Sequence, residues 1–251
     1  MRQLLPRPMD HVDPVTAHAA ADRPPPAGRP WVMVNMVASA DGATAVDGLS
    51  GSLGGDADRA VFSAIRAVAD VVVAAAGTVR AEGYGPPRTS EENQRARVAR
   101  GQEPLPRLAV VSRSLDLDPR SAMFTGGSQR PLVFTCETAD PGRLDRLSSV
   151  AEVVVCSGTS VAPGEILAHL HGSGAQVVLV EGGPSLNGAF LGADLVDELD
   201  LTTSPALVGG GSARLVSGAP ERVLPLSLAH LWEHEGVLLA RYVRARVRSD
   251  R

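Results

Sequence analysis

Residues 176–191 read Gln-Val-Val-Leu-Val-Glu-Gly-Gly-Pro-Ser-Leu-Asn-Gly-Ala-Phe-Leu. This stretch indicates the fold more directly than any other part of the sequence. Its apolar, β-branched run at 177–180 predicts a buried strand. Glu181, Gly182 and Gly183 end that strand, and Pro184 suits the first position of a helix. Such a turn leaves backbone N–H groups and the positive helix end available to an anion such as a phosphate. An ordinary strand-to-helix turn has the same pattern, so this stretch alone leaves both interpretations open.

The bulk composition is that of an ordinary globular protein. The chain has 251 residues, of which 44% are hydrophobic and 21% charged, with a net charge of −4. This charge gives no electrostatic footprint for nucleic acid or a membrane surface. No apolar run reaches the roughly 18 residues of a membrane span, and the N-terminus lacks the apolar core of a secretory signal. We therefore expect a cytoplasmic protein with no nucleic-acid or membrane partner.

Two features of the side-chain chemistry narrow the choice of mechanism. The sequence contains no lysine, which excludes a Schiff-base lysine and a phosphate-binding lysine of the Walker type. Cationic roles therefore fall to arginine, which binds phosphate and carboxylate through two parallel N–H groups. Cys136 and Cys156 each end an apolar run, and we expect them to be buried free thiols.

No metal site is expected. The paired histidines lack a cysteine or acid at a familiar zinc spacing, and we expect them to be structural or surface residues. They are His169, His171, His230 and His234.

The order of the patterned segments predicts an α/β fold with a mostly parallel, twisted sheet, flanking helices and an antiparallel C-terminal edge. Strands are expected at residues 31–37, 71–75, 108–111, 132–135, 153–156, 177–180, 195–204, 226–231 and 237–247. Helices are expected at 56–69 and 164–171, and a short helix at 141–147. Residues 1–29 lack apolar periodicity and are expected to form an irregular arm preceding one domain, 30–251. Residues 47–55, rich in glycine and serine, are expected to form a mobile loop, which either covers a site or is simply flexible.

Several polar residues fall where a ligand would lie. Asn35 stands inside an apolar strand, where an unpaired amide would cost about 1–3 kcal/mol, so it needs a partner in the core or in a substrate. Arg59 and Arg66 lie two turns apart on one helix, where they either face solvent or hold a substrate phosphate. A second strand–glycine–helix unit places the Thr78 hydroxyl at a helix start.

Ser112 and Arg113 follow another strand. A hydroxyl and an arginine at this point suit the 2′-phosphate of NADPH, whereas an acid would suit NADH. An exposed polar loop is the alternative explanation.

Four ordered motifs together resemble a known family: residues 35–42, 77–82, 181–186, and 195–199 with Gly209-Gly210. They resemble the reductase domain of the bacterial riboflavin-pathway deaminase-reductase, and more closely its stand-alone pyrimidine reductases, which share the dihydrofolate reductase fold. The resemblance covers residues 30–247. It implies a sheet of about eight strands, NADPH as reductant, a homodimer, and reduction of a phosphorylated pyrimidine's ribosylamino group to a ribitylamino group.

The resemblance also implies site residues. The cofactor contacts that it implies are Ala38, Thr78, Glu82, Ser112 and the turn at 183–189, which includes Gly183, Pro184, Ser185 and Leu186. The substrate contacts that it implies are Ser50, Arg66, Arg88 and Glu181. The local sequence adds Gly182 and Arg113 to the expected cofactor contacts and Asn35 to the expected substrate contacts. Glu181 is the expected catalytic residue, placed to handle a proton or a ribose hydroxyl.

This sequence departs from the family pattern at a few positions. Asn35 stands where bifunctional members carry lysine, Ser52 replaces an aromatic residue, Glu82 replaces an aspartate, and Tyr84 lies in an unusual Gly-Tyr-Gly. The zinc-binding pattern of the deaminase domain is absent from the sequence. The expected substrate is 5-amino-6-(5-phosphoribosylamino)uracil. The alternatives are another flat heterocycle such as dihydrofolate, or nucleotide binding without catalysis.

Overall fold

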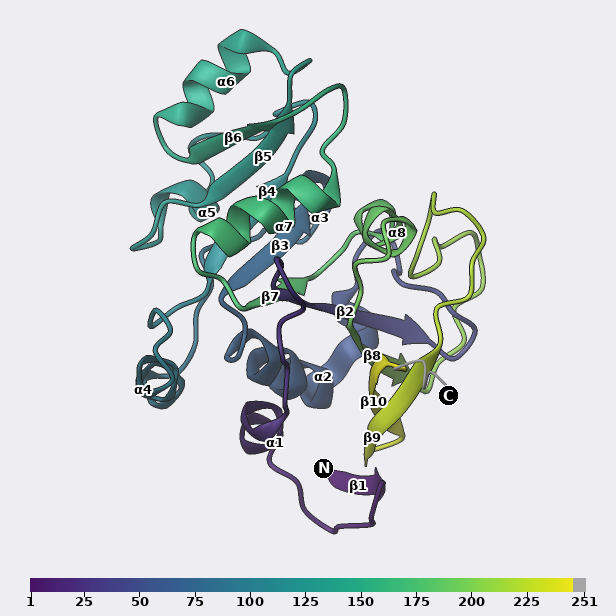
Figure 1. Cartoon of the computed structure of the whole chain (residues 1–251). Coiled ribbons are helices and arrows are strands. Elements are labelled where there is room, and N and C mark those ends of the chain that lie inside the picture. The colour runs from purple at the N-terminus through teal and green to yellow at the C-terminus, as the bar shows by residue number, and fades with distance from the viewer. Residues whose placement is uncertain (246–251) are drawn as a thin grey trace, which may run out of the picture.

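The computed structural model describes residues 1–245, and within them a single ten-stranded sheet runs through the molecule (Figure 1). The strand order is β1-β9-β10-β8-β2-β7-β3-β4-β5-β6. All neighbours from β8 to β6 are parallel, and the pairs β8–β10, β10–β9 and β9–β1 are antiparallel. The expected α/β class, parallel sheet and antiparallel C-terminal edge are confirmed.

Nine of the ten strands lie at segments expected from the sequence, and β1 is the exception. The strands are β1 (Arg2–Leu5), β2 (Trp31–Ser39), β3 (Val71–Ala75), β4 (Arg107–Val111), β5 (Leu132–Cys136), β6 (Glu152–Cys156), β7 (Val177–Val180), β8 (Glu198–Ser204), β9 (Leu226–His234) and β10 (Val237–Arg244). The last residues of the expected strand 237–247 lie outside the described part of the chain.

The helices are α1 (Pro14–Ala20), α2 (Gly51–Arg66), α3 (Ala76–Ala81), α4 (Glu91–Ala99), α5 (Ala122–Thr125), α6 (Pro141–Ser148), α7 (Pro163–Gly172) and α8 (Pro184–Gly192). Their starts follow from local sequence. Asp13, Ser90 and Asp140 cap α1, α4 and α6 through side-chain oxygens. Proline opens α1, α6, α7 and α8, where its missing N–H has no intrahelical partner to lose.

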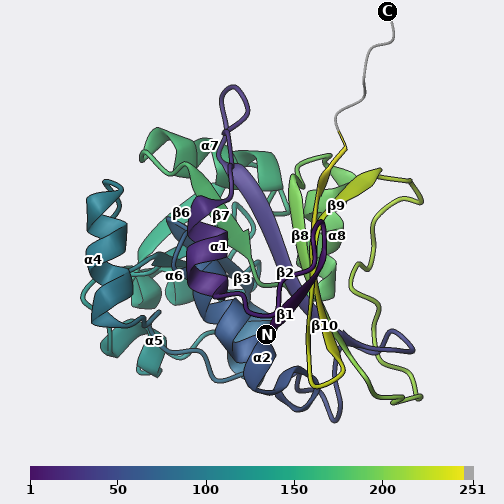
Figure 2. The ribbon, with the colours of Figure 1, turned by 90° about the horizontal axis from the view of Figure 1, so that it is seen from below.

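Helices cover both faces of the sheet (Figures 1 and 2). On one face, α2 buries Ala57, Val61 and Ile65 at helical spacing against strand residues such as Met33 and Val72. On the other face, α7 and α8 pack against residues of β2, β3 and β7. In the part of the chain that the structure describes, no helix combines the length and the apolar character needed to cross a membrane.

The N-terminal arm is more ordered than expected. Residues 1–29 include β1, which pairs with β9, and α1, which contacts α2. The prediction of an irregular arm is therefore wrong for these two segments. Local periodicity cannot identify a four-residue edge strand, because its partner lies more than 220 residues away in the sequence, at Glu233 opposite Arg2.

The expected loop at 47–55 is also partly wrong. Residues 51–54 are helical and are included in α2, which is interrupted at Gly55 by a φ of 70°. Glycine accommodates this left-handed backbone, so the kink falls where the sequence allows it. Cys136 and Cys156 are buried free thiols, as expected, and face each other in register on β5 and β6.

The sheet order reverses beside β7. The chain leaving β3 continues to its neighbour β4, whereas the chain leaving β7 crosses β2 to reach β8. In open α/β sheets, ligands bind beyond the carboxyl ends of the strands at such a switch point. The carboxyl ends of β2, β3 and β7 are therefore the expected position of a binding site.

Candidate active site

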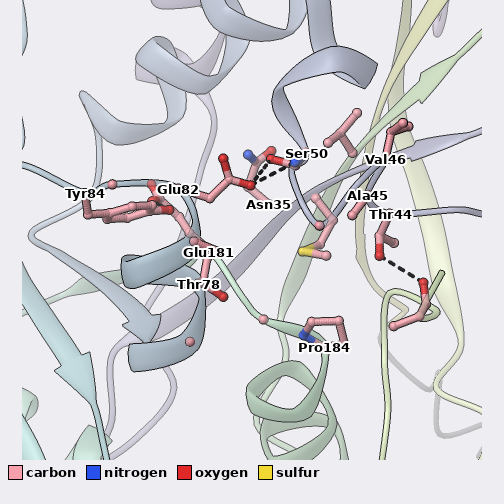
Figure 3. A pocket seen from close by; sticks show the side chains of 18 of the residues that line it. Asn35, Thr44, Ala45, Val46, Ser50, Thr78, Glu82, Tyr84, Glu181 and Pro184 are labelled. Atoms are coloured by element: carbon pink, nitrogen blue, oxygen red, sulfur yellow. Dashed lines mark hydrogen bonds between the residues drawn. The ribbon is translucent and has the colours of Figure 1, made fainter. Parts of the chain in front are cut away.

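A large cleft opens at this switch point. Its volume is about 1230 Å³, larger than the roughly 300–1,000 Å³ that is usual for small-molecule sites. It therefore has room for two ligands side by side. The expected site residues that line it are Asn35, Ser50, Arg66, Thr78, Glu82, Arg88, Glu181, Gly183 and Pro184. Figure 3 labels six of these residues, which are Asn35, Ser50, Thr78, Glu82, Glu181 and Pro184.

Two helix starts meet on one wall of the cleft. Glycine at 183 permits this contact, because a Cβ there would lie 2.9 Å from Thr78 Oγ1. Gly182 has a φ of 88°, and the peptide joining the two glycines is cis. The N–H groups of Leu186 and Asn187 donate to the Gly183 carbonyl, closing the first turn of α8. The predicted glycine turn thus lies in the cleft and brings the starts of α3 and α8 together.

Glu181, just past β7, accepts three hydrogen bonds. Arg66 donates from Nε at 2.6 Å and Nη2 at 2.7 Å, and the Tyr84 hydroxyl donates at 2.7 Å. Glu181 is buried, and the Arg66 guanidinium also stacks on the Phe62 ring, 4.2 Å from its centroid. These three donors hold the carboxylate in one position.

The same cluster changes the pKa of its partners. Burial raises the pKa of Tyr84, and the negative Glu181 beside it raises it further, so the phenol keeps its proton. Burial alone would lower the pKa of Arg66, but the hydrogen bonds and charge of Glu181 outweigh it and raise that pKa. Arg66 therefore reaches the cleft as a fixed cation whose Nε and Nη2 atoms already have a partner.

Glu82 and Ser50 form a second contact between helices. The Glu82 carboxylate accepts from the Ser50 N–H and from its hydroxyl, both at 2.8 Å (Figure 3). Ser50 is the N-cap of α2 but makes no side-chain capping bond of its own. From the sequence, Ser50 was expected to contact the substrate and Glu82 the cofactor. In the structure the two side chains are hydrogen-bonded to each other on the cleft wall.

Two further expected residues face the cleft without such pairing. Asn35, half-buried at the middle of β2, lines it beside the Ser50–Glu82 contact (Figure 3). Arg88 is exposed and forms no ion pair with the residues described here. It is thus a cation available to an anionic ligand.

The remaining expected cofactor residues do not line the cleft. They are Ala38, Ser112, Arg113, Gly182, Ser185 and Leu186. Ala38 and Leu186 are buried, and Leu186 packs in the core beneath α8. Ser112 follows β4, the neighbour of β3 in the sheet, and its buried Oγ has no hydrogen-bond partner within residues 1–245. Arg113, next to it, is exposed.

Sequence reasoning missed two parts of the wall. One is the loop at 208–213, held by Asp41, whose carboxylate accepts from the Val208 and Gly209 N–H groups. The other is Asp58, which lies on the same face of α2 as Phe62 and Arg66, at spacings of four and eight residues. That spacing was visible in the sequence and could have singled out Asp58.

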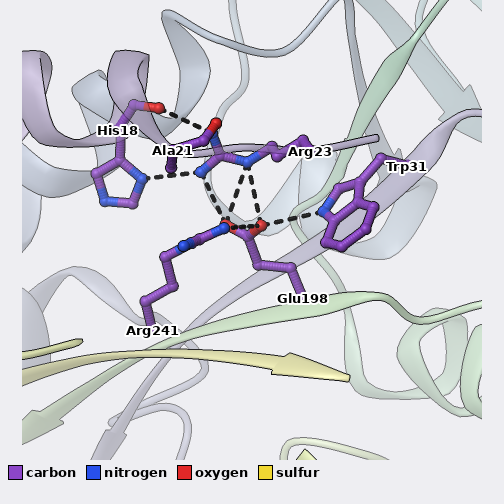
Figure 4. Close-up of polar contacts among 6 residues, drawn as sticks. All are labelled: His18, Ala21, Arg23, Trp31, Glu198 and Arg241. Atoms are coloured by element: carbon purple, nitrogen blue, oxygen red, sulfur yellow. Dashed lines mark hydrogen bonds and ion pairs between the residues drawn. The ribbon is translucent and has the colours of Figure 1, made fainter. Parts of the chain in front are cut away.

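A buried ionic cluster lies apart from the residues lining the cleft (Figure 4). Glu198 on β8 accepts bidentate hydrogen bonds from Arg241, both at 2.8 Å, and further bonds from Arg23 of the arm and the Trp31 indole. Glu198 and Asp200 lie on one side of β8, and this polar side of the strand is the buried one. His18, Glu198 and Asp200 lie close enough to resemble a metal site, but the two guanidinium groups on Glu198 oppose a cation there.

A parallel sheet with a cleft at its switch point, walled by a glycine turn and two helix starts, is the arrangement of a nucleotide-binding α/β enzyme. The chain belongs to the RibD C-terminal domain family, which matches residues 30–239. The family resemblance expected from the motifs is confirmed, and membership implies a reductase with a nicotinamide cofactor.

Individual relatives agree with this assignment. The chain is 31% identical over 191 residues to the 2,5-diamino-6-ribosylamino-4(3H)-pyrimidinone 5′-phosphate reductase of Methanothermobacter thermautotrophicus, covering 76% of this chain and 85% of the relative. It is 31% identical over 183 residues to the enzyme of the same name from Archaeoglobus fulgidus, covering 72% and 83%. A crystal structure of a pyrimidine reductase-like protein from Corynebacterium diphtheriae superimposes with a TM-score of 0.81 at 28% identity, covering 86% of this chain and 92% of that one.

Proposed function

We propose that this protein reduces the ribosylamino group of a phosphorylated aminopyrimidine to a ribitylamino group in riboflavin biosynthesis, with NADPH as the reductant. Two substrates fit this reaction. One is 5-amino-6-(5-phosphoribosylamino)uracil, and the other is the 2,5-diamino-pyrimidinone phosphate in the names of the relatives. The observation that carries the proposal is a single cleft that joins the Thr78–Gly183 wall to the cations Arg66 and Arg88.

The cofactor assignment rests on the turn after β7. The missing Cβ of Gly183 keeps the backbone open beside Thr78, and α8 directs the positive end of its dipole toward the cleft. NADPH would supply the hydride. Thr78, Gly183 and Pro184 would hold its diphosphate region, and Ser112 with Arg113 would contact its 2′-phosphate beyond the cleft wall.

The substrate assignment rests on the cations opposite this turn. Arg88 has its guanidinium available, and Arg66 is held by Glu181 with part of its fork directed away from that carboxylate. Together they would bind the substrate phosphate by charge-assisted hydrogen bonds. Asn35 and Ser50, which line the same cleft, would contact the sugar between the phosphate and the base.

Glu181 is the proposed catalytic residue. Three hydrogen bonds fix its position, so it would accept a hydrogen bond from a ribose hydroxyl and orient the anomeric carbon. The phenol of Tyr84 keeps its proton and fixes the second oxygen of the same carboxylate.

The test is a reductase assay with purified protein, NADPH and each candidate substrate, followed by nicotinamide absorbance. Mass spectrometry of the product should show the gain of two hydrogen atoms. No oxidation of NADPH above a heat-killed control with either pyrimidine would refute the proposal. Faster turnover of dihydrofolate would reassign the substrate, and tight NADPH binding with no turnover would indicate a nucleotide sensor.

We also propose that the enzyme acts as a homodimer in the cytoplasm. The family resemblance supports the dimer. Light scattering coupled to size-exclusion chromatography measures the mass directly, and a monomer at assay concentration would remove this part of the proposal.

A further inference from the structure

Asp58 is an acid in the cleft whose hydrogen-bonding capacity is largely unused. Within residues 1–245, the other buried or half-buried acids that line the cleft are Glu82 and Glu181. Glu82 accepts two bonds from Ser50, and Glu181 accepts three from Arg66 and Tyr84. The Asp58 carboxylate, in contrast, accepts no hydrogen bond of ordinary geometry within residues 1–245, and the buried Thr202 hydroxyl is its polar neighbour.

The protein holds this carboxylate in a defined place. Gly54 lies beneath it so closely that a Cβ on Gly54 would be 2.3 Å from Asp58 Oδ2. Thr202, on β8, lies beside it on the sheet side. A carboxylate held this way by a helix and a strand is preorganised to accept hydrogen bonds from a ligand.

Its position on α2 indicates which part of a ligand it would meet. Asp58 and Arg66 share one face of the helix and are eight residues apart, about 12 Å along the axis. If Arg66 binds the phosphate, Asp58 faces the opposite end of the substrate, which is the base.

We infer that Asp58 recognises the pyrimidine ring by accepting hydrogen bonds from two adjacent donors, the ring N3–H and an amino group at C2. This inference rests on the proposed function and selects between its two substrates. A carboxylate is an acceptor at both oxygens, so it pairs with two neighbouring N–H groups.

The two candidate bases differ at this edge. The 2,5-diamino-pyrimidinone presents N3–H beside a C2 amino group, so both positions are donors. The uracil presents N3–H beside a C2 carbonyl, whose oxygen would face a carboxylate oxygen without a proton between them. A site built to receive two donors rejects a ligand that leaves its polar groups unpaired. Asp58 therefore makes this protein a reductase of the 2-amino compound.

The test compares kcat/KM for the two pyrimidine phosphates with NADPH in the full-length protein. We expect the wild type to prefer the diamino compound by at least about tenfold. Asp58→Asn exchanges one acceptor for a donor, which matches N3–H beside a carbonyl. It should shift the kcat/KM ratio toward the uracil by at least about tenfold. The affinity for NADPH, measured by fluorescence titration, should stay unchanged.

Two further variants keep the test valid if Asp58→Asn fails to fold. Gly54→Ala pushes the carboxylate aside while keeping it in the chain, so it should lower the preference at an unchanged melting temperature. Asp56→Asn is the matched control, because it makes the same change on the same helix at a side chain that is 90% exposed. It should leave the ratio as in wild type.

The outcomes separate the two proposals. If neither pyrimidine is reduced, the proposed function fails. If both are reduced with similar kcat/KM, or if Asp58→Asn and Gly54→Ala both leave the ratio unchanged, the role of Asp58 is overturned while the reductase function stands.

Discussion

The carboxylate of Glu82 accepts hydrogen bonds from both the N–H and the hydroxyl of Ser50, each at 2.8 Å. This pair joins the residue that follows α3 to the residue that precedes α2. It therefore connects the helix that starts on the proposed cofactor side with the helix that carries Asp58 and Arg66. Two expected ligand contacts thus also hold the cleft together.

Glu82→Gln should loosen this connection. Both Ser50 bonds end on the same oxygen, Oε1, so the amide can keep them, but it removes the negative charge that strengthens each bond. We expect KM for the pyrimidine to rise about 5- to 30-fold, the equivalent of about 1–2 kcal/mol. Glu92→Gln, on the exposed start of α4, is the control. Steady-state kinetics that do not distinguish the two variants would contradict this role.

Arg66→Ala removes both a proposed phosphate contact and the main partner of Glu181. We expect KM for the pyrimidine phosphate to rise by about 10- to 150-fold, or about 1.5–3 kcal/mol, with NADPH affinity nearly unchanged. Glu181 is left buried with only Tyr84 as a donor, so the melting temperature should also fall. Arg95→Ala, at an exposed position on α4, controls for the loss of a charge. Equal weakening of NADPH and substrate binding would remove Arg66 from the substrate side.

Gly183→Ala tests the wall shared by α3 and α8. The new Cβ would lie 2.9 Å from Thr78 Oγ1, so the hydroxyl must move and the opening beside it narrows. We expect the Kd for NADPH, measured by fluorescence, to rise about tenfold, a loss comparable to one hydrogen bond to a charged group. Gly164→Ala adds the same methyl group near the start of α7, where nothing lies within 4 Å. An unchanged Kd in Gly183→Ala would place the diphosphate elsewhere.

Arg113→Ala tests the choice of NADPH over NADH. Arg113 is exposed at the end of β4 beside the Ser112 hydroxyl, which has no hydrogen-bond partner among the described residues. If this pair receives the 2′-phosphate, KM for NADPH should rise about tenfold or more and KM for NADH should stay constant. Parallel changes in the two KM values would exclude a 2′-phosphate contact at this arginine.

The buried histidines predict how stability depends on pH. Burial lowers the pKa of His18 to about 3 and that of His230 to about 4. Both folded values lie below the unfolded value of about 6.5, so the unfolded chain binds more protons as the solution becomes acidic. The stability from these neutral rings is complete above about pH 6.5 and is lost as the pH falls toward the folded values.

For Asp200 the stability depends on pH in the opposite direction, because burial raises the pKa of its carboxyl group. The stability that the protonated carboxyl contributes is lost as the pH rises through its pKa in the folded protein. Denaturant unfolding should show the free energy of unfolding falling by about 1.4 kcal/mol per pH unit on account of His18 as the pH is lowered from 6 to 4. His18→Gln should remove that slope, and His11→Gln, at an exposed position, should keep it. A slope that is the same in both variants would contradict the assignment to His18.

Much of the sheet could be predicted because its strands carry strong local signals. The runs at 71–75 and 177–180 are apolar and end at glycine-containing turns, and both strands have the expected bounds. The arm was missed for the opposite reason. β1 and α1 are stabilised by contacts to β9 and α2. The local pattern of residues 1–29 does not indicate which distant segments they contact.

The site was predicted as a set of residues but not as a set of pairs. Ser50, Arg66, Glu82 and Glu181 all line the cleft, yet their mutual hydrogen bonds depend on how α2, α3 and β7 meet. The sequence pattern pointed to Arg59 as a ligand contact on this helix and not to its neighbour Asp58, yet the Arg59 side chain is 67% exposed. Burial decides between neighbours on a helix, and it is a property of the packed molecule.

Arg23 lies before the first residue of the family match, but its guanidinium ends inside the molecule on Glu198. A version of the enzyme trimmed to the matched segment would leave the interior carboxylate with one of its two cations, at a cost of about 3–5 kcal/mol. The first 29 residues are therefore an integral part of the reductase fold, and homology alone would place the edge of the folding unit too late.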